Sequence, residues 1–135
     1  DEKLYGNEIL SSKFLNIHLI WNEGIAFGLF SFEKTHLYNL LTAVIIIIII
    51  LIGIITINSS GIKKYALLMI FGGAIGNLYD RIIFKAVPDF VDLHFGNFHW
   101  FIFNFADVFI SVGVFFMILY EFIGNNESKR EDEKN

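Results

Sequence analysis

The stretch that decides the fold is LYNLLTAVIIIIIILIGIITI, which runs from Leu37 to Ile57 without a charged residue. In a helix with a rise of about 1.5 Å per residue, a stretch of this length crosses the hydrocarbon layer of a bilayer. Consecutive isoleucines favour a strand, but a single strand in lipid would leave its backbone polar groups unpaired. The stretch therefore predicts a membrane-spanning helix over residues 37–57.

Two further apolar runs extend the pattern. Trp100 to Tyr120 contains Asp107 as its only charged residue, and Tyr65 to Tyr79 is uncharged up to Asp80. The second of these runs is short for a span unless its polar end lies at the membrane surface or faces protein. We expect membrane helices at residues 65–81 and 100–123, with a cytoplasmic loop at 58–64 between the first two spans.

The composition supports a membrane protein. Of the 135 residues, 55% are hydrophobic and 18% are charged, against about 25% charged in soluble domains. The net charge of −4 and the thinly spread Lys and Arg residues argue against nucleic-acid binding. The absence of cysteine excludes disulfides, thiolate metal sites and cysteine nucleophiles.

Positive charges predict the orientation of the spans. Lys63 and Lys64 lie in the first connecting loop, and Lys129 and Arg130 follow the last span, so both segments are expected in the cytoplasm. Residues 1–36 and 82–99 are then extracytoplasmic, and the charged tail 124–135 is expected to be disordered. Because the chain begins with Asp1 and not Met, we expect a fourth span to precede it in the full-length protein.

One external segment has the pattern of a strand. From Phe14 to Trp21 apolar and polar side chains alternate, which is typical of a half-buried strand, and Asn22-Glu23-Gly24 follows as a turn. We therefore expect a mainly α membrane protein: a bundle of three spans in this chain, with a small extracytoplasmic β-cradle.

Polar residues within the spans are candidates for function, because a charge in lipid is costly. Asp107 lies about seven residues inside the predicted last span, roughly 10 Å deep, with Asn104 on the same helix face. A second stripe of Asn77, Asp80 and Arg81 lies near the same membrane surface. We expect the two stripes to form one site. The small residues Gly72, Gly73 and Gly76 would let the two helices approach closely.

Two aspartates that share a proton can hydrolyse a peptide bond, because one draws a proton from water while the other polarises the carbonyl. Asp107 can be half of such a pair, and the partner can be Asp80, Asp89 or Asp92. Pro88 restricts the backbone before Asp89 and can hold that residue in one direction. Spacing alone does not choose among the three.

A metal site is the alternative for the external loop. Asp89, Asp92, His94 and His99 are suitable zinc ligands. Their spacing matches no H-E-x-x-H helix, and the aromatic residues around them also fit a belt at the membrane interface. We therefore expect no metal and no other cofactor.

Four ordered boxes resemble the signatures of the lipoprotein signal peptidase family, bacterial signal peptidase II. The boxes are Asn22–Gly28 (NEGIAFG), Gly72–Arg81 (GGAIGNLYDR), Val87–Phe90 (VPDF) and Phe103–Asp107 (FNFAD). The resemblance covers about residues 14 to 120. It departs at Asp1-Glu2-Lys3, which does not reproduce the family's Asp-Gln-x-Ser/Thr-Lys pattern, so Asp1 receives no role.

The resemblance implies an aspartyl endopeptidase of the bacterial inner membrane, with its active site at the extracytoplasmic face. Such an enzyme cleaves diacylglyceryl-modified prolipoproteins on the amino side of the lipid-bearing cysteine. Its catalytic residues would be Asp89 and Asp107. The positions that match substrate-binding or supporting residues are Asn22, Gly24, Gly73, Asn77, Asp80, Arg81, Asn104 and Ala106. The resemblance also implies globomycin-type inhibitors, contact with membrane lipid and a monomer. Phe27 and Phe30, with Trp100 and Phe101, are candidates for closing over the site.

Two alternative functions fit the same residues. Presenilin-type proteases also carry a Tyr-Asp pair, as at Tyr79-Asp80, although their Gly-x-Gly-Asp box is missing here. A small membrane transporter or assembly subunit would use Asp107 to carry protons or to hold helices together.

Overall fold

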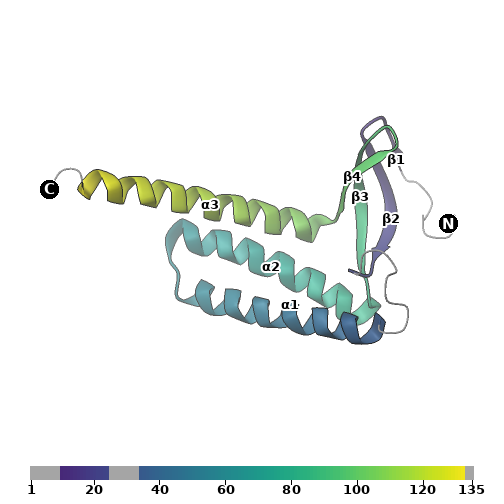
Figure 1. Ribbon diagram of the computed structural model, residues 1–135, viewed down its shortest axis with the longest axis horizontal. Helices are drawn as coiled ribbons and strands as arrows, with labels where there is room; N and C mark the ends of the chain where they lie inside the picture. The colour runs from purple at the N-terminus through teal and green to yellow at the C-terminus, as the bar shows by residue number, and fades with distance from the viewer. Residues whose placement is uncertain (1–9, 25–33, 133–135) are drawn as a thin grey trace.

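The computed structural model describes residues 10–24 and 34–132. Within them lie three helices, α1 (Lys34–Ile57), α2 (Gly61–Phe84) and α3 (Phe105–Asp132). Four strands form one antiparallel sheet: β1 (Leu10–Ser11), β2 (Leu15–Asn22), β3 (Val87–Phe95) and β4 (Phe98–Phe103). The helices lie side by side, and the sheet stands across one end of them (Figure 1).

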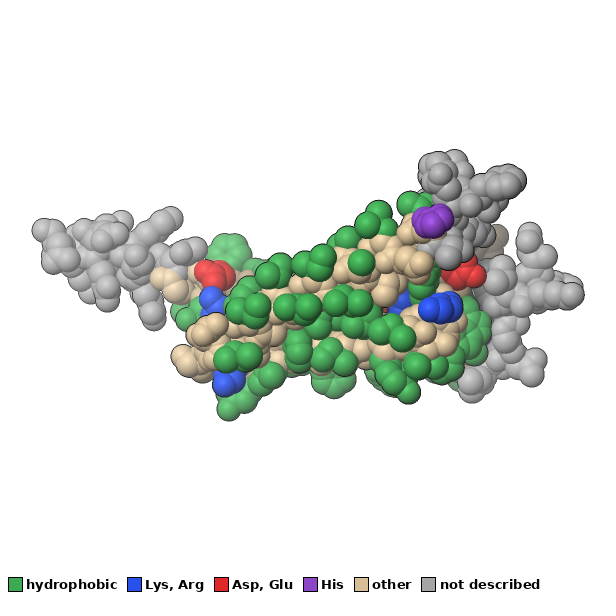
Figure 2. Space-filling model, turned by 90° about the horizontal axis from the view of Figure 1, so that it is seen from below, with side chains coloured by type: hydrophobic (Ala, Val, Ile, Leu, Met, Phe, Trp, Pro, Cys, Tyr) green, Lys and Arg blue, Asp and Glu red, His purple; other side chains and the backbone are tan. Residues whose placement is uncertain are grey.

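The three helices are long and apolar enough to cross a membrane. Large hydrophobic side chains are exposed along them, including Leu40 at 62% and Ile47 at 58%. Figure 2 shows these side chains covering the length of the helices, with charged residues gathered toward the ends. An apolar surface of this extent requires lipid rather than water around it. The expected multi-pass membrane protein, mainly α with a small sheet, is confirmed.

The first two helices are longer than predicted. α1 begins at Lys34 instead of residue 37, and α2 covers Gly61–Phe84 instead of 65–81. The predicted spans end where charged residues begin, but a spanning helix can continue into the polar interface with charged side chains at its ends. α2 ends where Lys85 adopts a left-handed conformation, and the Lys85 N–H donates to the Arg81 carbonyl.

The prediction for the last span is wrong at its start, whereas its predicted end at residue 123 agrees with the apolar part of the helix, which ends at Gly124. Residues 98–103 form β4, so α3 begins at Phe105 rather than at residue 100. The run from Trp100 to Phe103 is uniformly apolar and aromatic, a composition that suits a strand at the interface as well as a helix. α3 also continues to Asp132, although the tail was expected to be disordered from residue 124. Glu, Lys and Arg are good helix formers, and they extend a helix that is already nucleated.

The sheet has the order β1-β2-β3-β4 and brings distant segments together. The strand predicted from alternation at Phe14 to Trp21 is confirmed as β2. In its pairing with β3, Ile20 is opposite Asp89 and Asn22 is opposite Val87. The sheet therefore places Asn22 beside Asp89, although 67 residues separate them in the chain.

α2 and α3 pack closely through small residues. A Cβ atom at Gly73 would lie 2.5 Å from the Ala106 carbonyl oxygen, and one at Gly113 would lie 2.7 Å from the Ala66 carbonyl oxygen. Gly72, which was expected in this seam, faces open space. Close approach of the two backbones at Gly73 brings the polar residues of α2 against the first turn of α3.

Candidate active site

Asp89 is held in the middle of a hydrogen-bonded cluster. Its side chain on β3 is 3% exposed. Asn22 Nδ2 donates to Asp89 Oδ2 at 2.9 Å, and Asn104 Nδ2 donates to Asp89 Oδ1 at 2.8 Å. β2 and the residue after β4 therefore fix the carboxyl group of Asp89 from two sides.

Asp107 lies in the first turn of α3, not deep within a span as the sequence predicted. Asn104 is the residue before the helix, and its backbone N–H donates to Asp107 Oδ2 at 3.1 Å. In return, the Asp107 N–H donates to Asn104 Oδ1 at 3.1 Å. This reciprocal arrangement is a capping box, which satisfies donors that a helix N-terminus leaves unpaired.

Two asparagines connect the carboxyl groups of Asp89 and Asp107. Asn77 Nδ2 on α2 donates to Asp107 Oδ1 at 2.7 Å. Asn104 Nδ2 donates to Asn77 Oδ1 at 3.0 Å as well as to Asp89. The two stripes that the sequence placed at matching depth therefore do meet, through Asn77, Asn104 and Asp107.

The surroundings of Asp89 favour its protonated form. Burial raises the pKa of Asp89, and the nearby charge of Asp107 raises it as well. The hydrogen bonds from Asn22 and Asn104, and the charge of Arg81, act in the opposite direction without cancelling the rise. A carboxyl group of this kind can hold a proton under conditions in which an exposed aspartate is ionised.

Arg81 is buried beside the turn that follows β2. Its Nη1 donates to the Glu23 carbonyl at 3.4 Å, and its guanidinium carbon lies 5.7 Å from the centre of the Tyr38 ring. Gly24 has φ of +73°, and a Cβ there would lie 2.6 Å from Arg81 Nη1, so glycine fits both the conformation and the space. Arg81 thus supports the turn that carries Asn22.

The other two carboxylates proposed as partners of Asp107 lie outside this network. Asp80 makes no hydrogen bond or ion pair to any residue that the structure describes, and in particular none to Arg81. Asp92 bonds His99 instead. Of Asp80, Asp89 and Asp92, only Asp89 is joined to Asp107 through shared hydrogen-bond partners.

Two apolar hollows open beside the first turn of α3. A groove of about 640 Å³ between α2 and α3 is lined by Tyr65, Leu68, Met69, Phe109 and neighbouring residues. A smaller hollow of about 260 Å³ is lined by Phe101, Phe103 and Asp107, among others. Trp100 is 78% exposed on β4. Phe27 and Phe30, with residues 25–28 of the first box, lie outside the described residues.

The fold is that of a multi-pass membrane enzyme. Two solved structures described as bacterial membrane enzymes are similar to this chain, with TM-scores of 0.69 and 0.66 and sequence identities of 30% and 27%. The alignment with the first structure covers 85% of this chain and 74% of the other chain. The alignment with the second covers 90% of this chain and 74% of the other chain.

Sequence comparison gives the family. Residues 2–123 match the family described as signal peptidase (SPase) II, and the chain belongs to that family. The lipoprotein signal peptidase of Pelagibacter ubique is 52% identical over 128 residues, which are 95% of this chain and 76% of that protein. The lipoprotein signal peptidase of Anaplasma phagocytophilum is 42% identical over 88% of this chain and 78% of its own length. That of Aquifex aeolicus is 40% identical over 90% of this chain and 74% of its own length. The expected resemblance is confirmed, and the protein is a protease rather than a transporter.

Proposed function

We propose that this protein is an aspartic endopeptidase that removes signal peptides from diacylglyceryl-modified prolipoproteins, with Asp89 and Asp107 as its catalytic pair. Cleavage falls on the amino side of the lipid-bearing cysteine. The proteins named lipoprotein signal peptidase that share up to 52% identity with the chain support the substrate class. The observation that carries the catalytic assignment is the bonding of one residue, Asn104, to both carboxylates: its side-chain amide donates to Asp89 and its backbone N–H donates to Asp107.

The pair is suited to hydrolysis because its members have different environments. Asp89, whose pKa is raised by burial, keeps the shared proton and donates a hydrogen bond to the scissile carbonyl oxygen. Asp107 accepts the proton of the attacking water, so that hydroxide adds to the carbonyl carbon. The proton then passes to the leaving nitrogen as the C–N bond breaks. Two carboxyl groups in one site do not readily ionise together, which keeps one proton on the pair.

The apolar hollows fit a substrate that carries lipid. The 640 Å³ groove between α2 and α3 includes Phe105 and Ala106 of the first turn of α3, next to Asp107. An acyl chain in that groove would hold its peptide near the pair, and the substrate would arrive laterally from the bilayer. The positive charges at Lys63 and Lys64 favour the extracytoplasmic side of the bacterial inner membrane for the sheet and the site.

The test is cleavage of a diacylglyceryl prolipoprotein by the full-length protein, followed by gel mobility. Asp89→Asn and Asp107→Asn are each expected to lower kcat by at least about 10³-fold, within the usual range for removal of an acid–base group. Glu121→Gln is the matched control, because Glu121 is exposed near the far end of the membrane-spanning part of α3, where its carboxylate pairs with Lys63 at 3.9 Å. It should retain full cleavage.

The substitution Asp80→Asn separates this proposal from the presenilin-type alternative. Because Asp80 lies outside the hydrogen-bonded pair, it should lose less activity than either catalytic variant. Abolished cleavage in Asp80→Asn together with a mild effect of Asp89→Asn, in folded and inserted proteins, would refute the assignment.

A further inference from the structure

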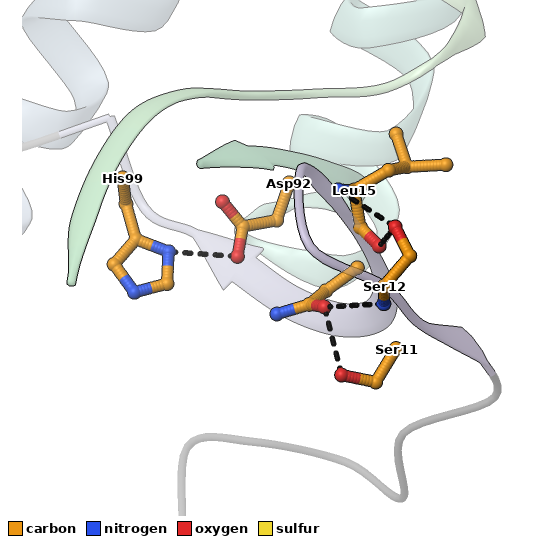
Figure 3. Close-up of polar contacts among 6 residues, drawn as sticks. Ser11, Ser12, Leu15, Asp92 and His99 are labelled. Atoms are coloured by element: carbon orange, nitrogen blue, oxygen red, sulfur yellow. Dashed lines mark hydrogen bonds and ion pairs between the residues drawn. The ribbon is translucent and has the colours of Figure 1, made fainter. Parts of the chain in front are cut away.

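A second polar cluster lies on the β3–β4 hairpin. Asp92 and His94 are on β3, and His99 on β4 is the direct partner of His94 in the sheet. The ring centres of the two histidines are 5.5 Å apart, and His99 Nδ1 lies 2.8 Å from Asp92 Oδ2. Figure 3 shows the Asp92 and His99 side chains pointing toward one another from the two strands.

This cluster contains buried polar atoms that lack a partner. Asp92 is 1% exposed, and its Oδ1 has no hydrogen-bond partner among the described residues. His94 Nδ1 is also a buried atom without a hydrogen-bond partner among the described residues. A buried carboxylate oxygen without a donor is costly, and such groups in native proteins are normally satisfied by protein, water or an ion.

The donor atoms are close enough to share one ion. One ligand atom from each of Asp92, His94 and His99 can be chosen so that all lie within 4.8 Å of one another. In a tetrahedral zinc site with bonds near 2.1 Å, the ligand atoms are about 3.4 Å apart, so side-chain adjustment suffices. Two imidazoles and one carboxylate suit zinc and its neighbours among the transition metals, rather than calcium or magnesium.

Spacing along the chain argued against a metal in this loop, but on the geometry of the folded hairpin we propose that Asp92, His94 and His99 form a zinc-binding site. Zinc takes the place of the proton between His99 Nδ1 and Asp92 Oδ2, and binding through both carboxylate oxygens also satisfies the unpaired Oδ1. The His99 side chain is 49% exposed, so an ion can enter from solvent and a water molecule can complete the coordination. Because residues three apart on a strand point to opposite faces, Asp92 lies across the sheet from Asp89. The site is separate from the proposed catalytic pair and does not depend on it.

The ion would cross-link the two strands of the hairpin. It joins β3, which carries Asp89, to β4, which leads into Asn104 and α3. The hairpin would then be more stable with zinc than without it, and the melting temperature of the protein would rise with zinc concentration.

The test is zinc binding by tag-free full-length protein in detergent, after removal of metal with a chelator. Equilibrium dialysis against zinc chloride, with metal determined by mass spectrometry, should give one zinc per chain. His94→Gln and His99→Gln should each weaken binding at least 100-fold, beyond the 10–100-fold typical of outer-shell substitutions. His36→Gln is the matched control, since His36 is exposed near the start of α1, and its binding should equal that of the wild type.

A spectroscopic measurement guards against variants that fail to fold. Cobalt added to the wild-type protein should give the visible absorption of a tetrahedral ion, which zinc then abolishes. Binding of less than one zinc per chain in the wild type, an octahedral cobalt spectrum, or unchanged binding in folded His94→Gln and His99→Gln would each overturn the proposal.

Discussion

Asn104 and Asp107 hydrogen-bond each other twice across the first turn of α3, each backbone N–H donating to the side chain of the other at 3.1 Å. The same Asn104 side chain also donates to Asp89 at 2.8 Å. A group proposed to act in catalysis is therefore also part of a helix cap. Stability and activity can be separated at Asn104, because the cap needs only an acceptor and the link to Asp89 needs a longer side chain with a donor.

Asn104→Ala and Asn104→Ser form the pair that separates these roles. Serine is as good an N-cap as asparagine, whereas alanine costs about 1 kcal/mol of stability. Serine is too short to reach Asp89. We expect Asn104→Ala to melt at a lower temperature than Asn104→Ser in detergent, while both variants lose most of their cleavage. Normal cleavage by Asn104→Ser would show that the link to Asp89 is dispensable.

Asn22→Leu should change the pH dependence of cleavage. The hydrogen bond from Asn22 Nδ2 lowers the pKa of Asp89, so a side chain of similar size without a donor lets that pKa rise further. Asp89 then keeps its proton to higher pH. The alkaline limb of kcat/KM should move to higher pH in Asn22→Leu and stay in place in Asn16→Leu, whose asparagine on the same strand bonds Ser11 and Ser12. A shift to lower pH would contradict the assigned proton.

Gly73→Ala should loosen the contact between α2 and α3. The new methyl group would lie 2.5 Å from a backbone oxygen of Ala106, which cannot turn aside as a side chain can. Overpacking of this kind costs about 1–3 kcal/mol. Gly72→Ala meets nothing within 4 Å and gains up to about 1 kcal/mol of helix propensity. Thermal unfolding in detergent should therefore rank Gly72→Ala at or above the wild type and Gly73→Ala below it. Equal melting temperatures would exclude a tight seam at Gly73.

The sequence was informative wherever a pattern has one physical meaning. A run of uncharged residues as long as Leu37 to Ile57 predicts a membrane span, and the alternation around Ile17 predicts a strand. The alternation did not predict which face is buried, because His18 is 3% exposed while Leu19 and Trp21 are 39% and 42% exposed. The run from Trp100 to Phe103 was ambiguous, because apolar aromatic residues suit an interfacial strand and a helix equally. That ambiguity put Asp107 too deep in the predicted membrane helix.

A local signal for the correct position of Asp107 was present. Asn104-x-x-Asp107 has the spacing of a capping box, with Asn and Asp in place of the usual Ser/Thr and Glu/Gln, and it marks the start of a helix. The long-range contacts were different in kind. The bond between Asn22 and Asp89 depends on the register of β2 with β3, and the pairing of Asp92 with His99 depends on the β3–β4 hairpin. Neither strand register can be predicted from the spacing of residues along the chain.

β4 ends at Phe103 and α3 begins at Phe105, so a single residue joins the sheet to a membrane helix. Because the connection is one residue long, we expect the first turn of α3 to rotate with the sheet when the sheet tilts against the bilayer. Asp89 on the sheet and Asp107 in that turn then move as one unit, so the separation of their carboxyl groups is expected to stay the same when the sheet tilts on the membrane surface. A bilayer of a different thickness would therefore shift both aspartates together and leave their geometry intact.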